Sequence, residues 1–415
     1  MLNVKAFRET CKRDNIFERI ANILLILYAA SIYIWSDDEK MVLFSTLLCF
    51  AAMAFMLLVI LPRRHIYLCQ SLIFLLLFDA YCIVSVLWAR EPARAVVIAF
   101  RTLPILTLFA IVLYNYIDEV DGKDCLIDAI YIAGIILALY TIFMQGGLSG
   151  YFQLMSSGVR VGDNVNNVNT IGLGTGISVI ISFYYTVFYK RYYHLAPLVL
   201  CGFVALGTGS NKALIIMVLG CLLCLLFYAY ANNNVFTFLK ALAFLLIAVV
   251  VFVSVIQLPM FKTINERFTG AVNAYLGKGE IDSSAQIRAA LVQAGLRQFK
   301  KTPFLGIGIN NGATVALEAV RKNYYLHNNY IELLVDCGVI GTLLFYSSFV
   351  SSLFIAVKNL KKGNSRYALV VIIIFAWMII QYGYVCYYSK DTYLYIVLAA
   401  SVAFPAPYTC KRIES

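Results

Sequence analysis

Long apolar runs recur along the whole chain and limit what it can fold into. A helix needs ~20 apolar residues to cross a bilayer, and runs of about that length fill most of the 415 positions. The apolar share is 62% and the charged share 13%, whereas a soluble domain has roughly 45–50% and 25%. We therefore predict an all-α polytopic membrane protein with about twelve transmembrane helices, forming one integral membrane domain over residues 1–415. The expected spans are roughly 17–36, 41–61, 66–88, 96–117, 124–145, 168–189, 194–208, 213–232, 235–256, 329–357, 367–387 and 391–407.

Basic residues gather in alternate short loops, which predicts the orientation of the chain. If twelve helices alternate, these loops and both termini lie on one side, and an excess of Lys and Arg marks that side as cytoplasmic. The net charge of +11 is then explained by attraction to anionic lipid rather than to nucleic acid. The basic residues of these loops are Lys5, Arg8, Lys12, Arg13, Arg63, Arg64, Lys190, Arg191, Lys358, Lys361, Lys362, Arg366, Lys411 and Arg412.

The longest polar segment, residues 257–326, falls between the ninth and tenth expected helices, on the periplasmic or extracellular side. It is too long and too patterned to be a simple connector. Ser283-x-x-Gln286 has the spacing of a capping box, and Ile287, Leu291 and Ala294 follow at helical intervals. This pattern predicts an amphipathic helix from about Ser284 to Lys301, which we expect on the outer surface of the membrane.

The next segment, which begins with Tyr324, contains one of only three histidines in the sequence. Asn329 and Glu332 have the N-x-x-E spacing of a capping box, which predicts that a helix starts there. His327 would then lie just outside a helix N-terminus, where the helix dipole favours the neutral imidazole that can accept a proton. The alternative is a histidine that only caps and packs.

Four titratable residues from distant parts of the sequence are expected at the same outer boundary: Arg160, Lys212, Arg288 and His327. Arginine binds phosphate oxygens in a fork and lysine acts as a point charge, so the set suits a lipid diphosphate whose head group lies at the interface. A departing diphosphate gains negative charge, which such cations would stabilise. No acidic cluster with metal-ligand spacing accompanies them, and the eleven cysteines show no metal or disulfide framework, so we expect no cofactor. Taken singly, each residue also suits an ordinary surface or snorkelling role.

Two features inside the spans have structural interpretations. The Gly172-x-Gly174-x-Gly176 run follows no strand and is typical of close helix packing rather than of dinucleotide binding. Asp79 and Asp128 fall within expected spans, where a charge is costly. Arg101 is their expected partner in a structural ion pair.

Several motifs together resemble the bacterial O-antigen ligase/polymerase superfamily. The turn Thr208-Gly209-Ser210-Asn211-Lys212 resembles the Gly-Ser-basic turn of that family. Arg288 followed by Pro303-Phe304-Leu305-Gly306-Ile307-Gly308 resembles its Arg…Pro-x-x-Gly-x-Gly loop. His327-Asn328-Asn329-Tyr330-Ile331-Glu332, with Gly338 and Gly341, resembles its His-Asn-x-x-x-Glu segment. Arg160 and Asn169 resemble the arginine and asparagine before its middle spans.

The resemblance implies a fold similar to C-type membrane glycosyltransferases and transfer of glycan from undecaprenyl diphosphate, without a nucleotide sugar or a metal. By the same resemblance Arg160, Lys212 and Arg288 hold the diphosphate. His327 assists the acceptor hydroxyl as a general base or orients the donor, and Asn169, Asn328 and Glu332 are supporting residues. The family often has Arg where Lys212 stands, and Lys keeps the charge but loses the fork.

Within this family a polymerase adds the chain to the next lipid-linked repeat unit, and a ligase transfers it to the lipid A core. The local sequences around Lys212 and His327 resemble those of polymerases more closely, which favours an O-antigen or capsular polysaccharide polymerase in the bacterial cytoplasmic membrane. A transporter or flippase of similar span number is a second alternative. The implied partners are the undecaprenyl diphosphate-linked glycan, the bilayer, a chain-length regulator and a flippase, with no nucleic acid.

Overall fold

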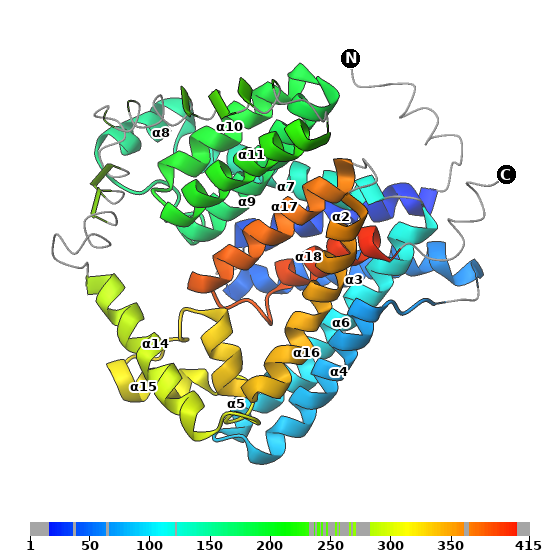
Figure 1. The fold of residues 1–415 in the computed structure, drawn as a ribbon, viewed down its shortest axis with the longest axis vertical. Helices are drawn as coiled ribbons and strands as arrows, with labels where there is room; N and C mark the ends of the chain where they lie inside the picture. Colours follow the sequence, from blue (N-terminus) through cyan, green and yellow to red (C-terminus); the bar gives the residue numbers. More distant parts are fainter. Residues whose placement is uncertain are drawn as a thin grey trace.

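The computed structural model describes residues 16–35, 39–63, 66–120, 123–231, 283–360 and 365–404, with isolated positions between 236 and 270. These residues form helices joined by turns, and the part of the chain that they cover has no strand. Figure 1 shows the helices in chain order from blue to red. The principal helices are α2 (Ile16–Trp35), α3 (Glu39–Ile60), α4 (Gln70–Ser85), α5 (Pro92–Val96), α6 (Leu103–Glu119), α7 (Lys123–Met144), α8 (Gly147–Ser156), α9 (Val168–Tyr189), α10 (Leu195–Gly207), α11 (Asn211–Ala231), α14 (Ser283–Lys301), α15 (Gly312–Val320), α16 (Asn329–Leu360), α17 (Ser365–Ile380) and α18 (Lys390–Ala403).

The all-helical membrane architecture expected from the apolar runs is confirmed. Within the described residues, nine helices are long and apolar enough to cross a bilayer. The expected span 194–208 corresponds to a shorter apolar helix, Tyr192–Gly207. The last expected span corresponds to α18, which has 14 residues. The span expected at 235–256 lies mostly outside the described residues, so the number twelve stays a prediction.

The helix α18 lies at the centre of the molecule. Figure 1 shows α17 and α18 between one group made of α8–α11 and another made of α4, α6 and α16. The central helix α18 contacts α2, α4, α6, α7, α16 and α17, and every residue from Asp391 to Ala403 is buried. A helix surrounded in this way has no need of a polar face.

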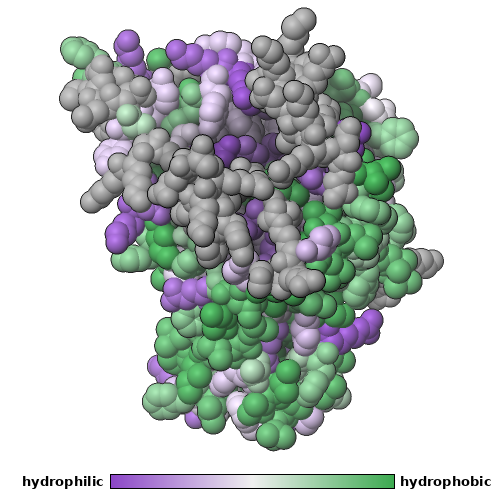
Figure 2. All heavy atoms as spheres, turned by 90° about the vertical axis from the view of Figure 1, so that its right-hand side faces the viewer, coloured by the Kyte–Doolittle hydropathy of each residue, from purple (hydrophilic) through white to green (hydrophobic). Residues whose placement is uncertain are grey.

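The outer surface of the bundle is apolar. Figure 2 shows a wide hydrophobic surface over the lower part of the side that it presents. Large exposed apolar side chains occur on α4 and α16, where lipid would cover them. They include Ile73, Leu77, Leu343, Val350 and Phe354.

Packing within the bundle agrees with one of the two structural interpretations and contradicts the other. A Cβ added to Gly172 would lie 2.7 Å from Cβ of Ala213, so the glycine run allows α9 and α11 to approach closely. The expected pairing of Arg101 with Asp79 or Asp128 is wrong. Asp79 faces Thr107 of α6, Asp128 accepts a hydrogen bond from Tyr185 at 3.3 Å, and Arg101 is exposed.

The external helix expected from Ser284 to Lys301 is α14, and its apolar face is the one expected. Leu291 and Ala294 are buried, with Ile287 packed beside them, in a cluster that includes Val335 of α16. The face is covered by protein because α14 packs on α15 and α16. The side chain of Ser283 lies outside the described residues, so the capping box there stays a prediction.

Candidate functional site

The segment that carries His327 is held by the first residues of α16. The helix starts at Asn329 as expected, but the capping box is different. Asn328 is the cap, since its Oδ1 accepts hydrogen bonds from the backbone N–H of Tyr330 (3.0 Å) and Ile331 (3.2 Å). Glu332 instead accepts from the N–H of Leu326 at 2.6 Å, and so holds the residue immediately before His327.

The side chain of Asn329 links α16 to the loop before α18. Its Oδ1 accepts from the backbone N–H of Cys386 (2.9 Å) and Tyr387 (3.1 Å). Its Nδ2 donates to the Tyr346 hydroxyl and to Oε1 of Gln381. Asn329 is fully buried, so this network positions the 381–387 loop beside His327.

Asp336 organises the loop that precedes α15. Its carboxylate accepts from the backbone N–H of Asn310 (3.0 Å), Asn311 (2.9 Å) and Gly312 (2.6 Å), and from the Tyr387 hydroxyl (2.9 Å). A carboxylate at the start of a helix satisfies N–H groups that have no partner within that helix. Asp336 is therefore a structural residue of the loop before α15, and through Tyr387 it also connects that loop to the loop before α18.

Gly338 breaks α16 at the point where the external loop crosses it. Its φ is 62° and ψ −166°, and a Cβ there would lie 2.2 Å from the Phe304 carbonyl oxygen. On one side of the break, the N–H of Ile307 donates to the carbonyl oxygen of Val335 (2.9 Å). On the other side, the N–H of Val339 donates to the carbonyl oxygen of Pro303 (2.8 Å). The Pro-x-x-Gly-x-Gly loop and the glycine of α16 thus form one unit.

The turn before α11 is fixed from the opposite side of the site. Arg160 Nε donates to the Thr208 carbonyl at 3.0 Å, and Ser210 Oγ donates to Oδ1 of Asn169 at 2.9 Å. Lys212 follows in the first turn of α11, and its Nζ donates to the carbonyl oxygen of Gly383. The turn therefore joins α9, α11 and the loop before α18.

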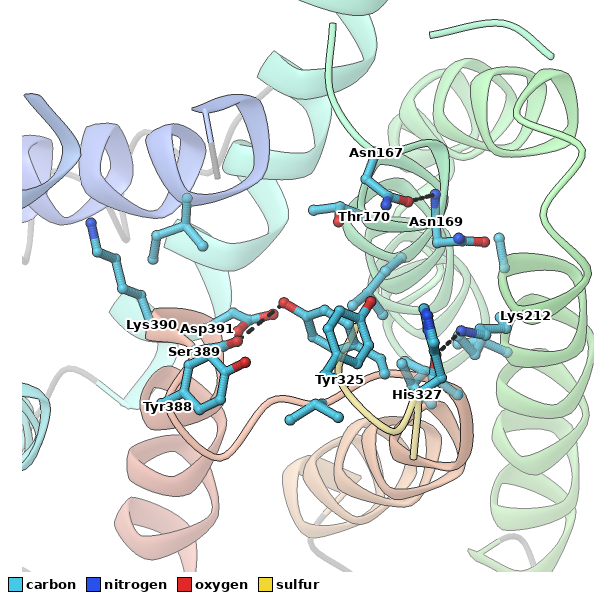
Figure 3. A pocket seen from close by; sticks show the side chains of 18 of the residues that line it. Asn167, Asn169, Thr170, Lys212, Tyr325, His327, Tyr388, Ser389, Lys390 and Asp391 are labelled. Atoms are coloured by element: carbon cyan, nitrogen blue, oxygen red, sulfur yellow. Dashed lines mark hydrogen bonds between the residues drawn. The ribbon is translucent and has the colours of Figure 1, made fainter. Parts of the chain in front are cut away.

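These segments surround a cavity of about 570 Å³. The residues that line it include four of those expected from the sequence, namely Asn169, Lys212, Arg288 and His327. Figure 3 shows Lys212 and His327 beside each other, with Asn169 above them on α9. Arg288 comes from α14 and completes this cationic end of the cavity.

Arg160 does not line the cavity. It lies behind the Thr208 turn, near enough for its charge, like that of Arg288, to act on Lys212. The electrostatic contribution of Arg160 is therefore indirect, through the field that it adds to the cationic end. Asn328 and Glu332 are buried and also do not line the cavity.

The backbone of His327 is in the left-handed region, with φ of 54°. Non-glycine residues adopt this conformation rarely, and it is kept where surrounding contacts demand it. The ring lies against Tyr325, with 4.2 Å between centroids, and its nitrogens make no hydrogen bond to any described residue. Burial, followed by the charges of Arg288 and Lys212, lowers the pKa of His327 to about 4. The imidazole is thus neutral at physiological pH.

The cationic end has no carboxylate paired with it. Within the described ranges, Arg288 makes no hydrogen bond or ion pair, and Lys212 bonds only a neutral carbonyl. Uncompensated positive charge in a partly enclosed cavity favours an anion, since the low local dielectric strengthens the attraction. The described residues contain no group of three or more His, Cys, Asp or Glu that could hold a metal ion.

The far wall of the cavity comes from residues that the sequence did not single out. They follow α17 and begin α18, with one contribution from α3, and they bring hydroxyl, amine, carboxylate and aromatic groups to the cavity. The only sequence signal for them was a short polar trio at the start of the last span. These residues are Ser45, Tyr384, Tyr388, Ser389, Lys390 and Asp391.

Comparison with known families gives a match over the middle of the chain. Residues 196–346 match the model of the O-antigen ligase family. The match is consistent with the O-antigen ligase/polymerase superfamily, whose members are glycosyltransferase-like enzymes, and it contains Lys212, Arg288 and His327. No curated protein matches the chain.

Proposed function

We propose that this protein is a glycosyltransferase that polymerises undecaprenyl diphosphate-linked repeat units into O-antigen or capsular polysaccharide on the outer face of the cytoplasmic membrane. The observation that carries the proposal is the cationic end of the cavity, where Lys212, Arg288 and His327 meet without a carboxylate partner among the described residues. The match of residues 196–346 to the O-antigen ligase family supports the same class of reaction.

The cationic end has the chemistry to bind a diphosphate. Arg288 can donate two parallel hydrogen bonds to phosphate oxygens, and Lys212 adds a compact positive charge. Asn169 of α9 also lines this end of the cavity and offers an amide donor. When the bond from the sugar to the diphosphate breaks, negative charge grows on the leaving oxygens, and fixed cations stabilise that charge more than they stabilise the ground state.

His327 is placed to contact the same diphosphate. Its neutral ring has one N–H donor and one acceptor, and the two cations beside it attract the phosphate oxygens toward that donor. The metal independence of the reaction is part of the proposal, since these protein cations would neutralise the leaving group.

A ligase that transfers the finished chain to the lipid A core is the second candidate, because the matched family is described as O-antigen ligase. Both enzymes would use the same donor and the same cationic end. They differ in the acceptor, so the cationic residues do not separate them.

Gel analysis of surface glycan in a deletion strain tests the proposal. Loss of a polymerase leaves single repeat units on the core, whereas loss of a ligase leaves long lipid-linked chains that never join the core. Complementation with Arg288→Ala or His327→Ala should fail to restore the ladder if these residues act as proposed. Movement of lipid-linked oligosaccharide across vesicles without glycosidic bond formation would instead support a transporter. A flippase and a chain-length regulator are the partners that a polymerase would need.

A further inference from the structure

The cavity has a second polar end, away from Lys212 and His327. Ser389, Lys390 and Asp391 lie at the start of α18, and Ser45 of α3 lies beside them, hydrogen-bonded to Lys390. Figure 3 shows this group at the opposite side of the cavity from Lys212 and His327. The two ends differ in charge, because, among the residues described, the first presents Lys212 and Arg288 without a carboxylate, whereas the second presents the carboxylate of Asp391 next to the amine of Lys390.

Asp391 presents an incompletely satisfied carboxylate. The residue is 3% exposed, and its Oδ1 accepts one hydrogen bond, from the backbone N–H of Thr392 at 3.0 Å. The neighbouring amine of Lys390 bonds the hydroxyls of Ser45 and Thr46, both at 3.1 Å, and not the carboxylate. In the part of the chain that the structure describes, no cation pairs with Asp391. A buried carboxylate ordinarily has several partners, so this one is suited to receive hydrogen bonds from a ligand.

Aromatic rings line the cavity between its two ends. Figure 3 shows Tyr325 in this middle part and Tyr388 beside Ser389 and Asp391, and Trp35 of α2 also lines the cavity. The Tyr384 hydroxyl is hydrogen-bonded to Ser389 Oγ at 3.1 Å. Flat apolar faces beside hydroxyl and carboxylate groups suit a sugar, which has C–H faces and hydroxyl edges.

We propose that this end of the cavity binds the acceptor sugar and that the carboxylate of Asp391 takes the proton from its attacking hydroxyl. This inference rests on the proposed function. The hydroxyl oxygen forms a bond to the anomeric carbon of the donor, and the bond from that carbon to the diphosphate oxygen breaks. The diphosphate leaves with the electron pair, and the proton passes to Asp391 and then to water. The acceptor is thus a hydroxyl-bearing glycan, and the new bond has inverted configuration.

The placement of the two ends supports this assignment. In a direct displacement, the nucleophile and the leaving group lie on opposite sides of the anomeric carbon. The cations that suit the leaving group and the carboxylate that suits the nucleophile come from opposite ends of one cavity. His327 is on the leaving-group side, and its pKa, lowered to about 4 by burial and by Arg288 and Lys212, makes it a weak base there. His327 therefore positions the diphosphate.

The test uses the full-length protein in lipid nanodiscs with a synthetic polyprenyl diphosphate-linked oligosaccharide as both donor and acceptor. Asp391→Asn should lower the turnover of glycosidic bond formation by ~10²–10⁴-fold, the usual contribution of a general base, while donor affinity stays within about twofold. The control is Asp79→Asn, which changes another buried carboxylate that does not line the cavity. It should leave turnover unchanged.

A second variant separates loss of a base from loss of structure. In Asp391→Ala, sodium azide should attack the anomeric carbon without needing to lose a proton, and should yield a glycosyl azide of inverted configuration. Turnover of Asp391→Asn within about threefold of the wild type would overturn the proposal, and so would absence of the azide product. If the wild type itself transferred no sugar from the lipid diphosphate, the proposed function would fail instead.

Discussion

Replacing Gly383 by alanine should displace the amine of Lys212 without removing its charge. A Cβ at position 383 would lie 2.6 Å from both Cε and Nζ of Lys212. Non-bonded heavy atoms are comfortable at about 3.5–4.0 Å, so the amine must shift by about 1 Å. The atoms in conflict are the far end of a flexible side chain, so folding should be little affected.

The expected cost follows from this shift. A misplacement of about 1 Å can lower a rate by about 100-fold, which corresponds to ~2.7 kcal/mol of transition-state stabilisation. We expect kcat/KM of Gly383→Ala for the lipid-linked donor to fall by between about 10-fold and 100-fold. The yield and the thermal midpoint of the purified protein should match those of the wild type.

The matched control is Gly202→Ala in α10, where an added Cβ would make ordinary contact, 3.8 Å from Val179. This variant should keep full activity. The assay is glycan transfer from a synthetic polyprenyl diphosphate donor by the protein in nanodiscs. Unchanged kcat/KM in Gly383→Ala, with folding intact, would refute the role given to the Lys212 amine.

Three further predictions concern the same site. Arg288→Lys keeps the charge but loses the two parallel hydrogen bonds, so its kcat/KM should fall by roughly 10-fold, taking ~1.5–3 kcal/mol for each charged hydrogen bond. Arg288→Ala loses both the charge and the hydrogen bonds, so its kcat/KM should fall by roughly 10³-fold. Equal activity of the two variants would contradict this prediction. His327 should titrate near pH 4, so the ring is neutral above about pH 5 and gains its proton only as the pH falls through about 4. The titration can be followed by ¹⁵N NMR of the three histidines, with the His327 signal assigned by comparison with His327→Gln. A titration midpoint above about pH 6 would disprove this prediction. Gly338→Ala should destabilise the fold by more than about 2 kcal/mol. The reason is that Gly338 has a φ of 62° and an added Cβ would clash with the carbonyl oxygen of Phe304. A thermal midpoint equal to that of the wild type would exclude this prediction.

Local patterns in the sequence predicted the helices well. The start of α16 at Asn329 and the buried face of α14 around Leu291 follow from side chains spaced along one helix. The cap of α16 was not predictable in detail, because Asn328 and Asn329 have the same chemistry. The structure assigns capping to Asn328, since Asn329 turns toward the N–H groups of Cys386 and Tyr387.

The candidate site was predictable only in part, for a related reason. Lys212, Arg288 and His327 could be expected at one boundary because the order of the spans places their loops on one side. The position of Arg160 behind the cavity could not be predicted, since it depends on the hydrogen bond to Thr208. The presence of Asp391 in the cavity lining could not be predicted either, because no motif surrounds it.

The sequence alone thus determined the class of the protein, because the length and apolarity of a run are local properties that decide whether a helix is stable in lipid. Only the tertiary structure decided which polar groups share a cavity. The Lys212 amine donates a hydrogen bond to the carbonyl oxygen of Gly383, 171 positions away in the chain, and Asn169 and Asp391 line the same cavity. Such contacts depend on how helices pack, and sequence separation does not encode their distance in space.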